Sequence, residues 1–117
     1  MTAEEFVKAV DKVVRLGAVQ ALMTALEKPP GRRPQPALVA QSEWFRSLAP
    51  NERELLKGVL DDAVDHAIFG FFCVLDGVRA VENGPNKGDF ILSYVKGTST
   101  PLNGPDLPML HDLYAAR

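Results

Sequence analysis

The hydrophobic positions of the first 27 residues follow a helical period. Apolar side chains recur three or four residues apart, at Phe6, Val10, Val13, Val14, Leu22, Ala25 and Leu26. Thr2 and Glu5 have the spacing of a capping box, so we expect the helix to begin at Thr2. Gly17 interrupts the pattern and costs about 1 kcal/mol relative to alanine in a helix interior, which predicts a bend or a division there. Pro29 and Pro30 end the element.

Residues 28–36 form a proline-rich stretch that also carries Lys28, Arg32 and Arg33. Proline fixes φ and has no amide donor, so this stretch is predicted to be an extended internal connector. A second helix is predicted over Ala37–Leu48, where the apolar side chains resume.

The strongest helical pattern starts at Pro50 and ends before Gly77. Its apolar residues form two adjoining stripes at i, i+4 spacing, namely Leu55, Leu56, Val59, Leu60, Ala63, Val64, Ala67, Ile68, Phe71, Phe72 and Leu75. Pro50 suits the first helical position, although Ala49 has no side-chain oxygen with which to cap the helix. Gly77 can adopt the left-handed conformation that ends a helix.

The other side of this third helix changes character along its length. It begins polar, at Lys57, Asp61, Asp62 and Asp65, and becomes apolar at Phe69 and Cys73. A helix that is apolar all round is covered all round. We therefore expect the Phe69–Cys73 side to lie under the following hairpin or under a second copy of the chain.

The residues after Gly77 have strand and turn composition. Two strands are predicted, over 78–82 and 89–96, with turn residues 83–88 between them and a loop over 98–104. Asp106 can cap a short final helix that carries Leu107, Leu110, Leu113 and Tyr114. The sequence thus predicts an α+β fold that is predominantly α, with three to four packed helices, a C-terminal β-hairpin and a short terminal helix.

Length and composition favour one small domain over residues 1–117. The chain has 117 residues, 46% hydrophobic and one cysteine, which fits a single core without disulfides in a reducing compartment. The N-terminal segment is acidic and no apolar run reaches about 18 residues, so we expect neither a signal peptide nor a membrane span, and a cytoplasmic location. A net charge of −2 excludes a generally basic nucleic-acid-binding surface.

Asp62 and His66 are the best candidates for chemistry. They stand at i, i+4 on the third helix, so both could reach one divalent metal, or the carboxylate could orient the imidazole as a base. His111 would complete such a site if it met His66 in space. Cys73 cannot join, because seven residues of helix rise about 10.5 Å. The alternative is a solvated acidic face, which we favour because no second metal-binding motif is present.

Four further residues are candidates for contacts with other molecules. Cys73 is flanked by apolar residues, where a thiol is expected to pack in the core and to be unreactive. Arg32 and Arg33 form a small cationic patch, which by default is part of a solvated connector. Trp44 and Phe45 cannot share one helix face, so one of these rings is expected at a pocket or an interface.

No catalytic, nucleotide-binding or cofactor-binding motif occurs in the chain. The run 67–78 and the ending 110–114 resemble segments of small bacterial domains without an assigned activity, and the resemblance implies no site residues. The leading hypothesis is therefore a small intracellular protein that binds another protein, in an adaptor or immunity-like role, or binds itself as a homodimer. Its interaction candidates are Phe69, Cys73, Trp44, Arg32 and Arg33. The alternative is a small-molecule or metal-dependent binding or hydrolytic site around Asp62 and His66, and a nucleic-acid role ranks third.

Overall fold

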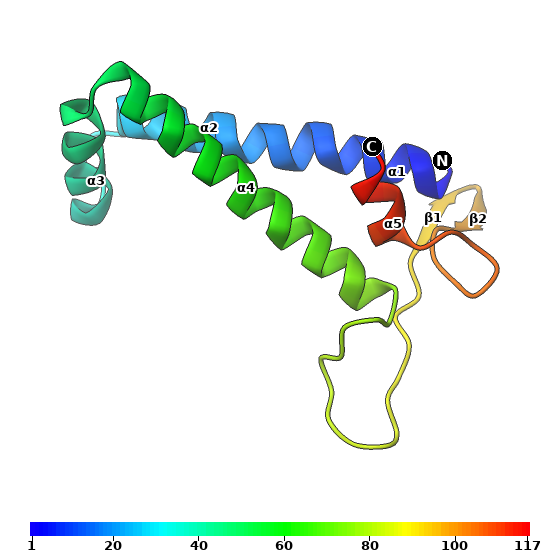
Figure 1. The fold of residues 1–117 in the computed structure, drawn as a ribbon. Coiled ribbons are helices and arrows are strands. Elements are labelled where there is room, and N and C mark those ends of the chain that lie inside the picture. Colours follow the sequence, from blue (N-terminus) through cyan, green and yellow to red (C-terminus); the bar gives the residue numbers. More distant parts are fainter.

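The computed structural model describes residues 1–117 and has an α+β fold that is mainly α, as the sequence predicts. In chain order the elements are α1 (Ala3–Val10), the π-helical η1 (Asp11–Leu16), α2 (Gly17–Glu27), α3 (Pro36–Ser47), α4 (Pro50–Leu75), β1 (Ser93–Lys96), β2 (Thr98–Pro101) and α5 (Leu110–Ala115). Figure 1 shows α1, η1 and α2 as one long helix, from which α4 diverges. The short α5 lies between α1 and the C-terminal half of α4.

The first helix begins at the predicted capping box but has no break at Gly17. The Thr2 hydroxyl accepts from the Glu5 amide at 3.1 Å, and the Glu5 carboxylate accepts from the Thr2 amide at 2.8 Å. Gly17 has an ordinary helical φ of −62°, and no neighbouring atom lies close to where its Cβ would be. The predicted bend at Gly17 is therefore wrong, and the helix continues through this residue, where η1 gives way to α2. The departure from α-helical geometry lies in the six residues of η1 just before Gly17.

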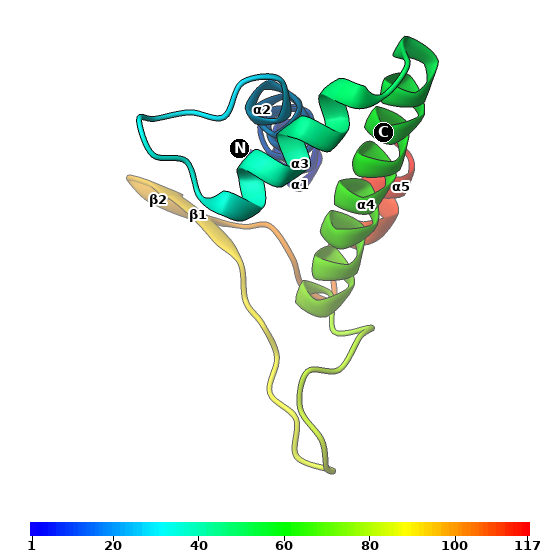
Figure 2. The same cartoon turned by 90° about the vertical axis from the view of Figure 1, so that its left-hand side faces the viewer.

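The second helix begins one residue before its predicted start, with Pro36 in the first turn. α3 packs across α2 (Figure 2), and the buried Ser42 hydroxyl donates to the Leu26 carbonyl at 2.6 Å. Phe45 is buried beside this contact, and the Arg53 guanidinium lies 5.2 Å from the centre of its ring. The pair α2–α3 thus forms one end of the molecule.

The third helix has its predicted limits, Pro50 and Leu75. The Ala49 side chain cannot cap it, and the Glu52 carboxylate instead accepts from the Ala49 amide at 2.7 Å. At the other end Gly77 has a φ of +77°, and the amides of Val78 and Arg79 donate to the Cys73 carbonyl. This is the left-handed helix end that the sequence predicts.

The main core lies where α1, α4 and α5 meet. Its fully buried side chains are Val7, Phe72, Leu110 and Tyr114. The centre of the Phe72 ring lies 5.4 Å from that of Tyr114 and 6.1 Å from that of Phe6, and the Phe6 and Phe72 rings are nearly perpendicular. These contacts fix α5 against the two longer helices.

The β-hairpin occurs later in the chain than predicted. β1 and β2 pair antiparallel in the register Ser93↔Pro101, and the chain reverses at Gly97, whose φ is +70°. The predicted strand 78–82 is wrong, and the predicted loop 98–104 is partly wrong because β2 lies within it. Residues 78–92 form a long irregular segment that extends away from the helices (Figure 2). Its apolar residues Val78 and Val81 are exposed, and no neighbouring strand pairs with them.

Asn103 ties this irregular segment to the end of α4. Its buried side-chain amide donates to the carbonyls of Leu75 at 2.7 Å and Phe90 at 2.9 Å. Its side-chain oxygen accepts from the Leu92 amide at 2.8 Å. One side chain thereby forms hydrogen bonds with three backbone groups that have no partner within a helix or a strand.

The molecule is less compact than is usual for a chain of 117 residues. Its radius of gyration is 18.3 Å, whereas a compact chain of this length has about 13 Å. Only 12 of the 117 residues are buried. Much of the apolar content therefore remains on the surface.

Candidate functional site

A network of charged side chains joins η1, α4 and α5 near the middle of the long helix. The Arg15 guanidinium is 2.6 Å from an Asp11 carboxylate oxygen and 2.5 Å from an Asp61 carboxylate oxygen. Asp61 is one of the acidic residues on the predicted polar side of the third helix, and here it is an ion-pair partner. The network takes Asp11 and Arg15 from consecutive turns of η1, where the backbone departs from α-helical geometry.

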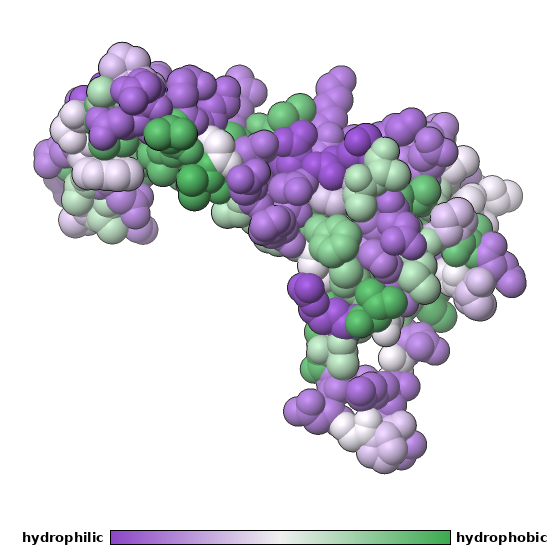
Figure 3. All heavy atoms as spheres, in the orientation of Figure 1, coloured by the Kyte–Doolittle hydropathy of each residue, from purple (hydrophilic) through white to green (hydrophobic).

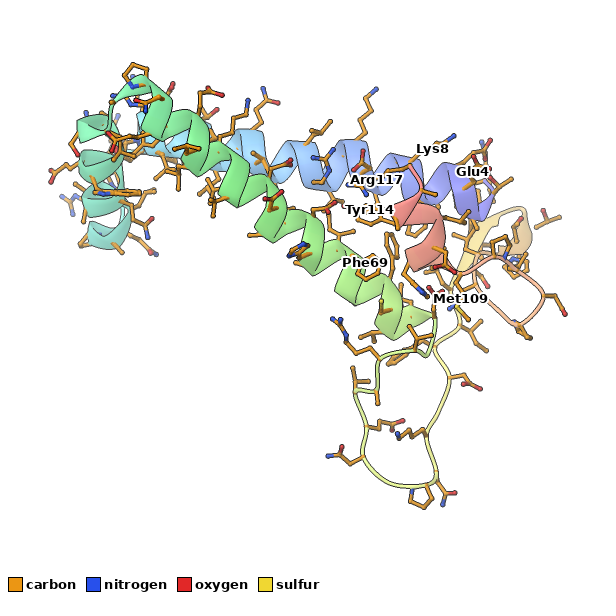
Figure 4. All side chains as sticks on the ribbon, in the orientation of Figure 1. Glu4, Lys8, Phe69, Met109, Tyr114 and Arg117 are labelled. Atoms are coloured by element: carbon orange, nitrogen blue, oxygen red, sulfur yellow. The ribbon has the colours of Figure 1, made fainter.

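Arg117 and Tyr114 complete the network from the C-terminal side. Both project from the region of α5 into the space between the long helix and α4 (Figure 4). Arg117 pairs with Asp11 and Asp65, and its guanidinium lies 3.7 Å from the centre of the Tyr114 ring. The Tyr114 hydroxyl donates to Asp65 at 2.8 Å. Sequence reasoning placed Tyr114 on the short final helix but missed its hydroxyl contact, Arg15 and Arg117.

The network shifts the pKa values of three of its members, Asp11, Asp65 and Tyr114, away from neutral pH. The hydrogen bond from Arg15 is the main cause that holds the pKa of Asp11 below its ordinary value. Burial acts to raise the pKa of Asp65, but the hydrogen bonds from Tyr114 and Arg117 outweigh it and leave that pKa lowered. Burial, together with the hydrogen bond to Asp65, raises the pKa of Tyr114 to about 12. Near neutral pH Asp11 and Asp65 are therefore ionised and Tyr114 is neutral. None of these groups has a pKa suited to proton transfer at this pH, so the network favours a role in holding the helices together.

His111 belongs to a second polar cluster, around Asp76. The Asp76 carboxylate accepts from the amides of Leu110 at 3.0 Å and His111 at 2.8 Å, and it lies 2.7 Å from His111 Nδ1. His111 Nε2 is 3.3 Å from Asp112. Asp76 therefore caps α5 in place of the predicted Asp106, which lies four residues before the helix begins.

Asp76 was missed by sequence reasoning, although one signal was available. A negative charge at the C-terminal end of a helix opposes the helix dipole. Asp76 stands at that end of α4, which indicates a partner elsewhere in the chain. That partner is the N-terminal turn of α5, where a carboxylate is favourable.

The structure does not assemble a site around Asp62 and His66. Both residues are exposed on α4. No hydrogen bond, ion pair or ring contact joins either of them to His111, whose ring nitrogens face Asp76 and Asp112. No group of three His, Cys, Asp or Glu side chains is placed to share a metal ion. Asp62 and His66 are thus part of a solvated face.

Comparison of the chain with models of protein families, with curated proteins and with solved structures finds no match. None of the helices has the length and apolar character that crossing a membrane requires.

The Phe69–Cys73 side of α4 is covered from within the chain. The Phe69 ring meets the His111 ring edge to face at 5.7 Å, and it points toward α5 in Figure 4. Cys73 is 6% exposed, and the Arg79 guanidinium lies over Gly70. The expectation that protein covers this side is confirmed. The expected cover was only partly right. α5 lies against Phe69, which the sequence did not predict, whereas Arg79, from the segment predicted as the first strand of the hairpin, lies over Gly70.

The other interaction candidates remain on the surface. Trp44 is exposed on α3 while its neighbour Phe45 is buried, which confirms that the two rings face different ways. Arg32 and Arg33 are exposed on the connector between α2 and α3, and neither takes part in an ion pair.

A groove of about 770 Å³ separates α2 from the first half of α4. Its walls are formed by Leu16, Val19, Gln20, Met23, Thr24, Glu27, Glu54, Lys57, Gly58 and Asp61. The polar side chains at its rim, such as Gln20, Glu27 and Lys57, are exposed. In a small-molecule site a few polar side chains point toward one position inside the pocket, and the side chains at the rim of this groove do not.

The most continuous unpartnered surface lies on α4. Five exposed apolar residues follow one another at intervals of four, and together they form the α4 stripe: Leu55, Val59, Ala63, Ala67 and Phe71. The exposed fractions of Leu55, Val59 and Phe71 are 70%, 63% and 61%. Hydrophobic residues are visible on the surface near both ends of α4 in Figure 3. The stripe is one of the two apolar stripes of the sequence pattern, and the fold leaves it bare.

Proposed function

We propose that this chain is a protein-interaction module whose binding surface is the α4 stripe. The supporting observation is that all five stripe residues are exposed although they belong to one of the two apolar stripes of the longest helix of the chain. Residues spaced by four follow a row that winds slowly around the helix, so the central residues Val59, Ala63 and Ala67 can meet one partner surface together, with Leu55 and Phe71 at its two flanks. From Leu55 to Phe71 the row is about 24 Å long, the length of a helix-in-groove contact.

The exposed side chains would contribute substantial binding free energy. Complete burial of a leucine, valine or phenylalanine side chain is worth roughly 1.5–3 kcal/mol. Leu55, Val59 and Phe71 are each more than half exposed and could contribute most of that amount on binding. An apolar row of this extent on a soluble chain is typical of an interaction site.

The geometry gives less support to a small-molecule or nucleic-acid function. Asp62 and His66 are exposed and have no third ligand near them. The cations of Arg32 and Arg33 lie on an exposed connector, and the chain as a whole carries a net charge of −2. An adaptor-like role through α4 requires neither of these features.

A photo-cross-linking residue at a stripe position tests the proposal in cells that produce the protein. We expect benzoylphenylalanine in place of Ala67 to form a covalent adduct with protein. The same residue in place of Ala18, an exposed alanine of α2, is the matched control and should form none. The Val59→Asp substitution should abolish the adduct at position 67 because it places a charge in the apolar row. Equal adducts at both positions, or none at position 67, would contradict the proposal.

A further inference from the structure

The tripeptide Asn-Gly-Pro occurs twice in the chain, at residues 83–85 and 103–105. In an Asn-Gly pair the backbone nitrogen of the glycine can attack the side-chain carbonyl carbon of the asparagine. The new C–N bond closes a succinimide ring, and the amide nitrogen leaves as ammonia. Water then opens the ring to aspartate or isoaspartate. The two copies have the same local chemistry, so a difference in their reactivity comes from the fold.

The first copy lies on the irregular segment 78–92, which extends away from the helices (Figure 2). Asn83 and Gly84 are exposed, and neither the Asn83 side chain nor the Gly84 amide takes part in a hydrogen bond. Apart from its two neighbours in the chain, no residue lies within 4 Å of the position that a Cβ of Gly84 would occupy. The Asn83 side chain is therefore free to turn its carbonyl carbon toward the Gly84 nitrogen.

The second copy is held by hydrogen bonds. Asn103 is 7% exposed, and its side-chain nitrogen donates to the carbonyls of Leu75 at 2.7 Å and Phe90 at 2.9 Å. Its side-chain oxygen accepts from the Leu92 amide at 2.8 Å. Departure of the nitrogen as ammonia would break two of these bonds, at a position that water hardly reaches. Reaction at Asn103 therefore requires this part of the structure to open first.

We propose that Asn83 is a site of spontaneous deamidation and that the fold protects Asn103 from the same reaction. The other two asparagines are not followed by glycine. Asn51 precedes Glu52 in the first turn of α4, and Asn86 precedes Lys87 on the irregular segment. A side chain on the following residue hinders closure of the ring, so Asn83 is the fastest of the four sites.

Deamidation at Asn83 changes the charge of the segment and leaves the core intact. The number of acidic residues rises from 15 to 16 against 13 basic ones, so the net charge changes from −2 to −3. The new carboxylate adjoins Glu82, whose own carboxylate accepts from the Gly88 amide at 2.9 Å. Neither Asn83 nor Gly84 belongs to the main core. The product should therefore stay folded, with an unchanged Tm.

Peptide mapping by mass spectrometry, after incubation of the purified full chain in mildly alkaline buffer, tests the proposal. We expect the native chain to deamidate at Asn83 at least tenfold faster than at Asn103. Asn86 is the control for exposure, because it lies on the same segment, and it should also react at least tenfold more slowly than Asn83. Asn83→Gln should remove the more acidic form from isoelectric focusing, because glutamine would have to close a larger ring.

The same measurement in denaturant separates the effect of the fold from that of the local sequence. In the unfolded chain Asn83 and Asn103 should react at similar rates, whereas Asn86 should remain slow. Four results would overturn the proposal. They are no deamidation at Asn83, equal native rates at Asn83 and Asn103, an Asn86 that reacts as fast as Asn83, and a difference between the two copies that denaturant leaves unchanged.

Discussion

The Asp76 carboxylate binds His111 twice, through the backbone amide at 2.8 Å and ring Nδ1 at 2.7 Å. With the Leu110 amide it thereby closes the first turn of α5 from the end of α4, across 34 residues of chain. The Asp76 side chain is 3% exposed. The position of α5, and with it the cover over Phe69, depends on this buried carboxylate.

Removal of the Asp76 carboxylate should destabilise the fold. We expect Asp76→Ala to lower the free energy of unfolding by about 2–3 kcal/mol, because it removes a helix cap and leaves the His111 ring without its buried acceptor. For 117 residues each kcal/mol corresponds to about 4 °C in Tm. Asp112→Ala is the control, since Asp112 is largely exposed and its loss should cost less than about 0.5 kcal/mol. Thermal melts in which both variants lose the same stability would refute the special role of Asp76.

Stability should decline in acid through Asp11 and Asp65. The pKa of each carboxyl is lower in the folded chain than its ordinary value of 3.8, through Arg15 for Asp11 and through Tyr114 and Arg117, against burial, for Asp65. Their contribution is therefore fully present above about pH 4 and is lost as the pH falls through the folded pKa values. Denaturant melts between neutral pH and about pH 2 measure this dependence.

The matched variant for the acid dependence is Arg117→Met, which keeps an unbranched, flexible side chain and removes the charged guanidinium. It should flatten the decline, because both carboxyls lose a cation that lowers their pKa. An equally steep decline in this variant would show that other carboxyls cause it.

Tyr114 should ionise at unusually high pH. Burial and the hydrogen bond to Asp65 raise its pKa from 10.0 to about 12. The stability that it contributes is fully present below pH 10 and is lost as the pH rises toward 12. Absorbance titration of Tyr94→Phe isolates Tyr114, because the chain has two tyrosines. A midpoint near 10 in the folded protein would contradict the contact with Asp65.

Cys73 should be unreactive while the protein is folded. It is 6% exposed on the side of α4 that also carries Phe69, and a thiol reagent can reach it only when this part of the structure opens. We expect labelling at neutral pH to be at least a hundredfold slower than in denaturant. Ala67→Cys supplies an exposed thiol on the same helix as a control. Rapid labelling of one thiol per wild-type chain in the native state would show that Cys73 is accessible.

Local signals in the sequence determined the helices. The capping box at Thr2, Pro50 in the first turn of α4 and the left-handed Gly77 each act on the adjacent backbone, so the predicted limits of α4 are correct. The same reasoning failed at residues 78–82, where strand composition finds no partner strand. Pairing is a property of two segments, and only the tertiary structure decided that β1 would fold back at Gly97 onto β2.

The tertiary structure also decided which apolar face of α4 remains open. The sequence pattern of α4 shows two apolar stripes and the apolar Phe69–Cys73 side. Hydrophobicity alone does not determine which of these three surfaces is buried. Because the Asp76 carboxylate caps the N-terminal turn of α5, that helix lies against Phe69, while the α4 stripe remains exposed. The contacts of Asp76 with His111 and of Arg117 with Asp11 join residues 35 and 106 positions apart, and no local spacing encodes them.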